Sequence, residues 1–493
     1  MGVMMTKPKG WWTNHPTILN VTVAGSWDSN GDGIGDFEGI RQHLDDLVAM
    51  GVSGLRFQQI TRFDDDFEWY GLVAQDWFDV DPLYGTMKDF ERLMNGCQER
   101  DIAVMVMAVP EYLGWQHPDY LAASKARRDG LNDPRVDWFS WEDDGTVETT
   151  WDRPAPDFAN PGYVEAYLEH LRFWMDKGVR GWDVDDLYSW KNLNVEALRE
   201  ITKCVIERDG FICSEHSTLE DDTTLRGGFN AGTGLHRSGF YREVDAIMEG
   251  NANYIRQGLA RRKQLIQYGM FPFQQFGDDI YERYSSKNKR FKRQQFRLQV
   301  AFNAALPDQV WALANTIAFP TKALTPLPTP LGVVCWGQLD HSEIARQKNN
   351  PESPFSFFQK MFRLRANEPA LGIGDLEELP TQLQEWLVAS PESSVYRLST
   401  DTALSKEPNN DIGQHQQSIW QTTFAGLRTS EDGSQKAVTV FHFSADPCRI
   451  EVAVGNQIKT LRNFLSGEVI SAKEGVVTVE LGRYGFKLLE VID

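Results

Sequence analysis

The sequence has few cysteines, no long apolar run and no excess of basic residues, and each absence excludes a class of protein. Its five cysteines are widely spaced and never form a C-x-x-C pair, which argues against a disulfide framework. No stretch approaches the ~20 apolar residues of a membrane span, and the first residues lack the apolar core of a signal peptide. The formal net charge of −20 disfavours contact with nucleic acid and anionic lipid. These features predict a cytoplasmic protein that binds neither nucleic acid nor membranes.

What is present is a chain long enough for a large core. Hydrophobic residues make up 41% and charged residues 24% of the 493 positions, which are ordinary globular proportions and exclude a mainly disordered chain. Aromatic residues reach 12%, with 16 tryptophans. Flat rings in this abundance suit a core first, and sugar faces second.

Short apolar segments alternate with amphipathic helical patterns from residue 17 onward. This alternation is typical of βαβ units and a parallel sheet. Eight expected strands favour a closed (β/α)8 TIM barrel of the α/β class over an open sheet. The expected strands are residues 18–24, 54–60, 102–109, 179–185, 211–215, 246–249, 270–276 and 331–336.

Two regions depart from this alternation. Residues 111–159 are too many and too polar for one loop, so we expect a small inserted B domain after the third strand. Beyond residue 375 the pattern changes to short strands between turn residues, which predicts an antiparallel C-terminal β-domain over residues 376–493. The barrel is then assigned to residues 1–110 and 160–375.

An acidic, glycine-bearing loop stands between the first two segments of this pattern. Residues 28–36 read Asp-Ser-Asn-Gly-Asp-Gly-Ile-Gly-Asp and place oxygen-bearing side chains at alternating positions. Hard cations such as Ca²⁺ or Mg²⁺ prefer such donors, although Gly39 stands where an EF-hand needs its glutamate. The alternative is an Asn/Asp/Gly turn held by its own side-chain-to-backbone hydrogen bonds. The predicted ligand set for a structural ion is Asp28, Asn30, Asp32, Ile34 and Asp36.

Three carboxylates come directly at the ends of expected strands: Asp185, Glu215 and Asp278. The carboxyl ends of barrel strands are where enzymes of this fold keep their chemistry. A retaining glycosidase needs a carboxylate nucleophile and a carboxylic acid about 5 Å apart. Each residue taken singly is as easily read as a helix N-cap or a surface charge.

Several motifs around these residues resemble the α-amylase superfamily of glycoside hydrolases, in its oligo-1,6-glucosidase and α-glucosidase branch. They occur in order over residues 11–375 at Trp11-Trp12, 25–40, 79–86, 173–179 and 362–371. The resemblance implies a catalytic barrel with a B domain, a metal on the first βα loop and a small carbohydrate substrate. It also implies that Asp185 is the nucleophile, Glu215 the acid/base and Asp278 the third carboxylate.

The expected sugar-binding positions differ from the family pattern. The strand-four motif Gly-Phe-Arg-x-Asp reads Gly181-Trp-Asp-Val-Asp185, so Asp183 replaces an arginine. Two carboxylates on one strand face should repel and raise the pKa of Asp185, unless a cation compensates. Glu111 adds further acidity, and Tyr112 and Trp115 are candidate stacking platforms, although packing explains both equally well. The predicted substrate contacts are Tyr112, Glu111, Asp183 and Trp115.

Two functions follow from these patterns. The first is a retaining α-glycoside hydrolase or transglycosylase with a modified −1 subsite, which acts on α-linked glucosides or a related sugar. The second is a catalytically inactive relative that binds carbohydrate or a protein partner through the barrel mouth. The presence of all three carboxylates beside many altered neighbours favours the enzyme, while the fold alone decides nothing.

Overall fold

The computed structural model describes residues 9–63, 71–185, 194–214, 223–233, 236–237, 240–276, 292–318, 325–328, 331–332, 337–387 and 419–493. The chain divides into two compact units. The first comprises Met1–Gly234, Lys263–Phe273 and Trp311–Arg346. The second comprises Leu235–Arg262, Gln274–Val310 and Gln347–Asp493.

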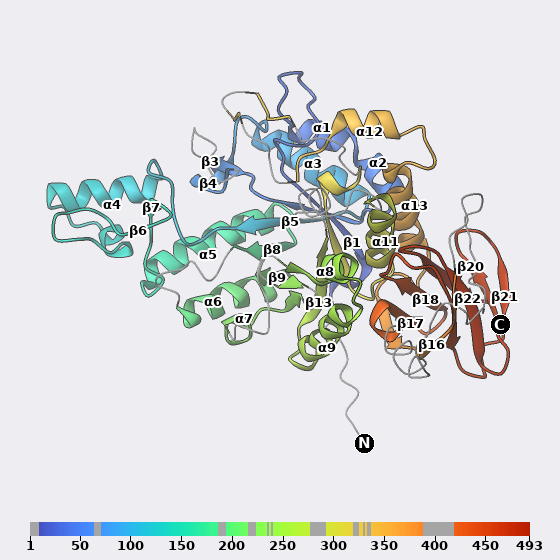
Figure 1. The fold of residues 1–493 in the computed structure, drawn as a ribbon. Helices are drawn as coiled ribbons and strands as arrows, with labels where there is room; N and C mark the ends of the chain where they lie inside the picture. Colours follow the sequence, from blue (N-terminus) through green and yellow to red (C-terminus); the bar gives the residue numbers. More distant parts are fainter. Residues whose placement is uncertain are drawn as a thin grey trace, which may run out of the picture. The chain divides into compact units, whose positions relative to one another are not determined.

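Eight strands form one sheet in the order β10-β13-β14-β1-β2-β5-β8-β9. Figure 1 labels β1, β5, β8, β9 and β13 of this sheet. The bounds of the eight strands are β1 Thr17–Val21, β2 Gly54–Phe57, β5 Ala103–Ala108, β8 Gly181–Val184, β9 Phe211–Ser214, β10 Ala231–Thr233, β13 Phe271–Phe276 and β14 Gln309–Leu313. Neighbouring strands pair in parallel, and β9 and β10, at the two ends of this order, contact each other. The expected (β/α)8 barrel is therefore confirmed.

The barrel strands are mostly apolar and are buried along their whole length, because both faces are covered. Every residue of β1 and of β5 is buried. The parallel register pairs Leu19 with Leu55, and Leu55 with Val104. Continuous apolar runs of this kind are typical of parallel sheets, in contrast to the alternation of sheets that face water.

Helices follow the strands in both units. In the first unit they are η1 Trp11–Asn14, α1 Phe37–Gln42, α2 Leu44–Ala49, α3 Met87–Glu99, α5 Pro161–Asp176, α6 Val195–Ile206, α7 Thr223–Arg226, η4 Ala314–Thr316 and α12 His341–Gln347. In the second they are α8 Arg242–Glu249, α9 Asn253–Gln267, α11 Lys292–Ala304 and α13 Pro354–Asn367. Local sequence explains several starts: Thr86 and Asp89 form a capping box on α3, and Asn160 caps α5 ahead of Pro161.

One expected strand was wrong, and another lies mostly outside the described residues. Residues 246–249 belong to α8, an amphipathic helix in which Ala246 and Ile247 are buried and Glu249 is exposed. The sixth strand is instead β10, whose Ala-Gly-Thr sequence gives no apolar run. The eighth strand is β14 and precedes the expected segment 331–336, of which residues 333–336 lie outside the described part of the chain.

The segment after β5 is structured, as expected of an insertion. It contains α4 Pro118–Asp129, η3 Pro134–Trp138 and the short pair β6 Thr149–Thr150 and β7 Arg153–Pro154. Tyr120, Phe139 and Trp141 pack together through their rings. Ahead of it, the antiparallel pair β3 Thr61–Phe63 and β4 Ala74–Val80 extends the loop that follows β2.

The C-terminal part consists of two antiparallel sheets, which confirms the expected β-domain. One has the order β15 Gly374–Glu378, β17 Thr423–Ser430, β18 Lys436–His442, β23 Phe486–Val491, β20 Thr460–Asn463 and β21 Val469–Ser471. The other has β16 Thr381–Trp386, β19 Cys448–Ala453 and β22 Val476–Leu481. Val438, Val440, Ile450 and Val477 of the two sheets share one core. A further short pair is β11 His236–Arg237 and β12 Phe240–Tyr241. A strand expected at 395–398 lies outside the described residues.

A glycine on the first helix allows a close approach of backbone that no other residue permits. A Cβ on Gly39 would lie 2.0 Å from the Trp27 carbonyl oxygen, which is fixed because it also accepts from the Asp36 N–H. We expect Gly39→Ala to lower the free energy of unfolding by about 3 kcal/mol or more.

Gly96 on α3 offers the matched control for this substitution. A Cβ there would meet the movable Leu44 side chain at 3.0 Å, and the helix would gain from alanine, so Gly96→Ala should change the stability by less than about 1 kcal/mol. Urea unfolding of both variants measures the difference. Equal losses in the two would contradict the backbone contact.

Candidate active site at the carboxyl ends of the barrel strands

Asp185 stands at the expected end of the barrel. It follows β8 directly, its side chain is 8% exposed, and its backbone N–H donates to the Ala108 carbonyl at the end of β5 at 2.8 Å. This places it at the carboxyl ends of two adjacent strands, where barrel enzymes hold their reacting groups. Glu215 is the residue after β9, and it and Asp278 both lie outside the described residues.

Asp183 is paired with an arginine from a different strand. Its Oδ2 accepts from Arg56 Nη2 at 2.5 Å and from Arg56 Nε at 3.1 Å, and both side chains are fully buried. The compensating cation that the sequence left open is therefore Arg56 of β2. It offsets the repulsion that was expected between Asp183 and Asp185. The expected contact of Asp183 with a substrate stays a prediction.

The ion pair belongs to a layer of polar side chains inside the barrel. Arg56 Nη1 donates to Asn20 Oδ1 at 3.0 Å, and Cys213 Sγ lies 3.3 Å from Asp183 Oδ1. Asn20 is the register partner of Arg56, and Asp183 is the register partner of Cys213. We call Asn20, Arg56, Asp183 and Cys213 the interior polar layer; it joins β1, β2, β8 and β9.

Sequence reasoning missed Arg56, although a signal for it existed. It is the one charged residue in the expected strand 54–60, and a charge in a buried strand requires a partner. The partner itself was invisible, because 127 residues separate Arg56 from Asp183.

The three expected contacts after β5 fall into two environments. Glu111 and Tyr112 are each 4% exposed, and Tyr112 packs with Leu72 and Val109 in an apolar cluster. This favours packing over stacking for Tyr112. Trp115 is 37% exposed, and its Nε1 donates to the Asp152 carbonyl at 3.1 Å. Of these residues, Trp115 has the ring that is exposed to solvent, and its contact with a substrate stays a prediction.

Tyr167 on α5 is a buried phenol in the same unit. Burial, followed by the charges of Glu111 and Asp185, raises the pKa of Tyr167 well above its usual value. No hydrogen-bond partner is found for its hydroxyl among the described residues. Sequence reasoning missed this tyrosine, since a Tyr in an amphipathic helix reads as core.

The acidic loop is held by its own backbone. Asp28 accepts from the N–H groups of Asn30, Gly31 and Gly33 at 3.0, 2.7 and 2.7 Å. Desolvation opposes ionisation, but these bonds together hold the pKa of Asp28 below its usual value. Asp36 caps α1 by accepting from the Gly39 N–H. Within the described ranges, no three acidic, histidine or cysteine side chains gather closely enough to hold a metal ion.

The cysteines of the described chain are buried, and for two of them burial strongly disfavours the thiolate. Cys97, Cys204, Cys213 and Cys448 are free and buried. Burial raises the pKa of both Cys97 and Cys448 to about 12, so neither forms a thiolate near neutral pH.

Among the helices that the structure describes, none has the length and apolar character needed to cross a membrane.

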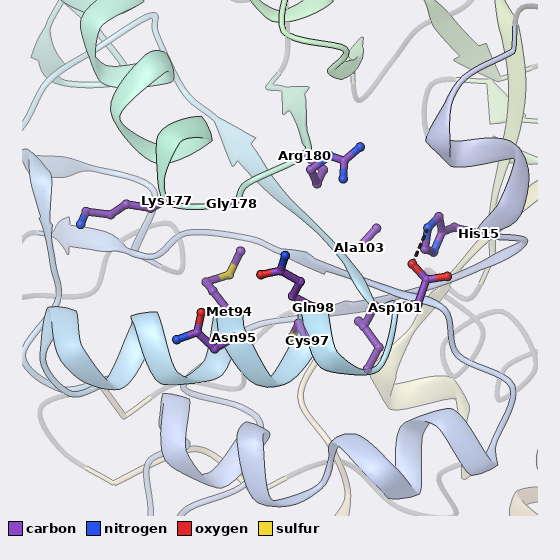
Figure 2. Close-up of a pocket in the computed structure, with 11 residues that line it drawn as sticks. His15, Met94, Asn95, Cys97, Gln98, Asp101, Ala103, Lys177, Gly178 and Arg180 are labelled. Atoms are coloured by element: carbon purple, nitrogen blue, oxygen red, sulfur yellow. Dashed lines mark ion pairs between the residues drawn. The ribbon is translucent and has the colours of Figure 1, made fainter.

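A separate pocket of about 210 Å³ lies at the other end of the barrel strands (Figure 2). Ala103, the first residue of β5, and Arg180, which precedes β8, both line it. His15 points toward Asp101 there, with 3.8 Å between Nε2 and Oδ1. Because Asp185 follows the carboxyl end of β8, this pocket is not part of the candidate active site.

Comparison with known proteins agrees with this architecture. The family model described as the catalytic domain of alpha amylase matches residues 26–202. A probable alpha-glucosidase of Rhizobium meliloti is 25% identical over 212 residues, which are 37% of each chain. The mouse (Mus musculus) amino acid transporter heavy chain SLC3A1 is 26% identical over 38% of this chain and 31% of its own.

A solved structure extends the similarity of fold to the whole chain. Amy13B of Eubacterium rectale superposes with a TM-score of 0.72 at 17% identity, over 99% of this chain and 97% of that one. The sequence matches to the relatives are shorter, and the chain spans about a third of their length, 37% of the Rhizobium protein and 31% of the mouse protein. The chain therefore shares its fold with the Eubacterium rectale structure, and over residues 26–202 it is similar to the catalytic domain of alpha amylase.

Proposed function

We propose that this protein is a retaining α-glycoside hydrolase or transglycosylase that acts on α-linked glucosides or a related sugar. The observation that carries the proposal is Asp185, which stands nearly buried at the carboxyl end of β8 above the Arg56–Asp183 ion pair. A carboxylate in this place can attack an anomeric carbon from one face of the ring.

Each carboxylate has a separate part in the proposed reaction. Asp185 forms the covalent bond to the sugar while Glu215 donates a proton to the leaving oxygen. Glu215 then removes a proton from water or a second sugar, whose oxygen displaces Asp185. Asp278 holds ring hydroxyls in the transition state. The roles of Glu215 and Asp278 rest on the sequence resemblance.

The proposed −1 subsite differs from the family pattern in its charges. Asp183 takes the place of an arginine, but Arg56 offsets its charge, so the added acidity comes from Glu111. An acidic pocket accommodates a cationic or amino sugar more readily than a neutral pocket does. Trp115 provides an exposed ring for stacking on a pyranose.

Substrate screening tests the proposal. Aryl α-glycosides and α-linked disaccharides, amino and uronic sugars included, are incubated with the protein between pH 4 and 9. Release of the aglycone or of free sugar supports the enzyme, and the best substrate identifies the subsite. The complete absence of turnover at high protein concentration would reject it.

A non-catalytic barrel that binds carbohydrate or a protein partner is the second candidate. It has support in the altered sugar-contact positions, and one relative carries the name of a transporter heavy chain and not of an enzyme. Binding of α-glucosides without turnover in the same screen would favour it.

We propose a structural Ca²⁺ or Mg²⁺ ion on the acidic loop. Asp28, Asn30, Asp32 and Asp36 offer side-chain oxygens and Ile34 its backbone carbonyl, a donor set that suits a hard cation. A hollow of about 340 Å³ opens on Asp32 and Asp36. Binding requires the carboxylates, now bonded to loop N–H groups, to turn toward the ion. The bound ion would neutralise the negative charge of the loop carboxylates.

Calcium should then stabilise the protein. At a concentration of 100 times the Kd, the ion adds about 2.7 kcal/mol, which thermal unfolding detects as a rise in Tm of a few degrees. Asp32→Asn keeps an acceptor for the Ile34 N–H but removes a charge, so it should reduce the rise. If Tm is insensitive to both Ca²⁺ and Mg²⁺, the loop is a self-bonded turn.

We also propose a cytoplasmic location, because the four cysteines of the described chain are free and buried, as expected in a reducing compartment.

A further inference from the structure

The ion pair in the interior polar layer lies directly beneath the proposed nucleophile. Asp183 and Asp185 are two residues apart at the end of one strand, so their Cα atoms are about 7 Å apart and their side chains leave the same face. Arg56 reaches Asp183 from β2 with two N–H groups. The layer under Asp185 therefore carries one positive and one negative charge.

We propose that Arg56 is a positioning residue: its guanidinium neutralises Asp183 beneath Asp185, so that Asp185 stays ionised for attack despite the neighbouring aspartate. The inference deepens the proposed function and rests on it. The family motif has its arginine on the strand of the nucleophile, whereas in this chain the guanidinium comes from β2 and an aspartate occupies that strand position.

The geometry argues against a purely structural pair. A buried ion pair adds little net stability compared with well-packed apolar side chains, so stability alone gives no reason to keep it. Arg56 is held from two sides, by Asn20 and by Asp183, which fixes the guanidinium within the barrel. Cys213 contacts Asp183 from the strand that leads to Glu215, so the layer touches both strands that carry the proposed catalytic pair.

Among the residues that the structure describes, the other ionisable groups assigned to this region are unchanged in every variant. They are Cys213, which contacts Asp183, together with Glu111 and with Tyr167; the ionisation of Tyr167 is coupled to that of Glu111 and Asp185. Changing the charge of the pair alone therefore isolates its influence on Asp185.

The experiment follows the pH dependence of kcat/KM with p-nitrophenyl α-glucoside, or with the best substrate of the screen. Asp183→Asn keeps the shape and an oxygen acceptor for Arg56 but leaves the guanidinium charge unbalanced. That charge favours ionised Asp185, so the acidic limb should move to lower pH, by on the order of one unit. In the double variant Arg56→Gln/Asp183→Asn the two positions together carry no net charge again. The acidic limb of its pH profile should lie within a few tenths of a pH unit of that of the parent.

A buried ion pair in the second unit provides the control. Arg262 and Asp308 lie 2.6 Å apart, both nearly buried, and Asp308 precedes β14 at the amino end of the strand. Asp308→Asn should lower Tm without moving the acidic limb. If Asp183→Asn behaves in the same way, with a lower Tm and an unmoved limb, the pair is structural and the inference is wrong.

Failure of the proposed function remains distinguishable from failure of this inference. If the parent turns over no substrate, the function is rejected, and the titration of Asp185 is followed directly by NMR with ¹³C-labelled aspartate, its signal assigned through Asp185→Asn. The same downward shift in Asp183→Asn, reversed in the double variant, would still support the charge coupling. An unchanged titration would overturn it.

Discussion

Asp185→Asn is expected to lower kcat by about a thousandfold or more while the fold is retained. An amide is a poor nucleophile and cannot form the glycosyl ester on which the proposed mechanism depends. The substitution preserves size, and the backbone N–H of residue 185 still donates to the Ala108 carbonyl. Steady-state kinetics with an aryl α-glucoside measure the loss, and circular dichroism verifies the fold.

The matched control is Asp101→Asn. Asp101 precedes β5 at the amino end of the strand and its side chain is 91% exposed, so the same chemical change there should leave kcat within about twofold. Equal activity of the parent and Asp185→Asn would remove Asp185 from the chemistry. It would leave the barrel without its assigned nucleophile.

Acid should destabilise the protein strongly below pH 6.5, because buried histidines are held neutral. Burial lowers the pKa of His117 to about 3, with a smaller effect from His170. It lowers the pKa of both His170 and His442 to about 4. The unfolded chain protonates each ring near pH 6.5, whereas the folded chain does so only below pH 4. The stabilisation is therefore complete above pH 6.5 and is lost as the pH falls toward 4.

The size of this loss follows from proton linkage. Each histidine removes about 1.4 kcal/mol of unfolding free energy per pH unit within that window. His170→Gln retains an N–H donor toward the Trp77 carbonyl, which His170 Nδ1 meets at 3.0 Å, and removes one titrating ring. Urea unfolding between pH 7 and 4.5 should give a slope shallower by about one proton in this variant. Identical slopes would show that His170 is protonated in the folded state.

The sequence predicted the elements of the fold well where periodicity was strong. The expected strands 54–60, 211–215 and 270–276 begin within one residue of β2, β9 and β13, because each is a short buried run that follows a turn. β10 was missed because three small residues carry no period, and residues 246–249 were misread because a four-residue apolar stretch fits a helix and a strand equally.

The sequence placed Asp185 correctly at the end of a barrel strand, whereas Glu215 and Asp278 stay predictions and the partners of Asp183 were not foreseen. A motif places Asp185 by local spacing alone, so its position after a barrel strand was confirmed. The Arg56–Asp183 pair depends on the barrel bringing β2 and β8 within reach across 127 residues, and single-sequence reasoning has no access to such a contact. From the sequence, Asp183 was therefore expected to repel Asp185. The folded chain brings Arg56 to Asp183 and compensates its charge.

Trapping of the covalent glycosyl-enzyme tests directly whether Asp185 is the nucleophile. The protein is incubated with a 5-fluoro α-glucosyl fluoride, which slows release of the glycosyl-enzyme, and is then digested and analysed by mass spectrometry. If Asp185 is the nucleophile, the peptide that contains it gains one fluoroglycosyl group, and Asp185→Asn gains none. A protein that hydrolyses α-glucosides but carries the label on another residue, or an adduct that persists in Asp185→Asn, would contradict this assignment.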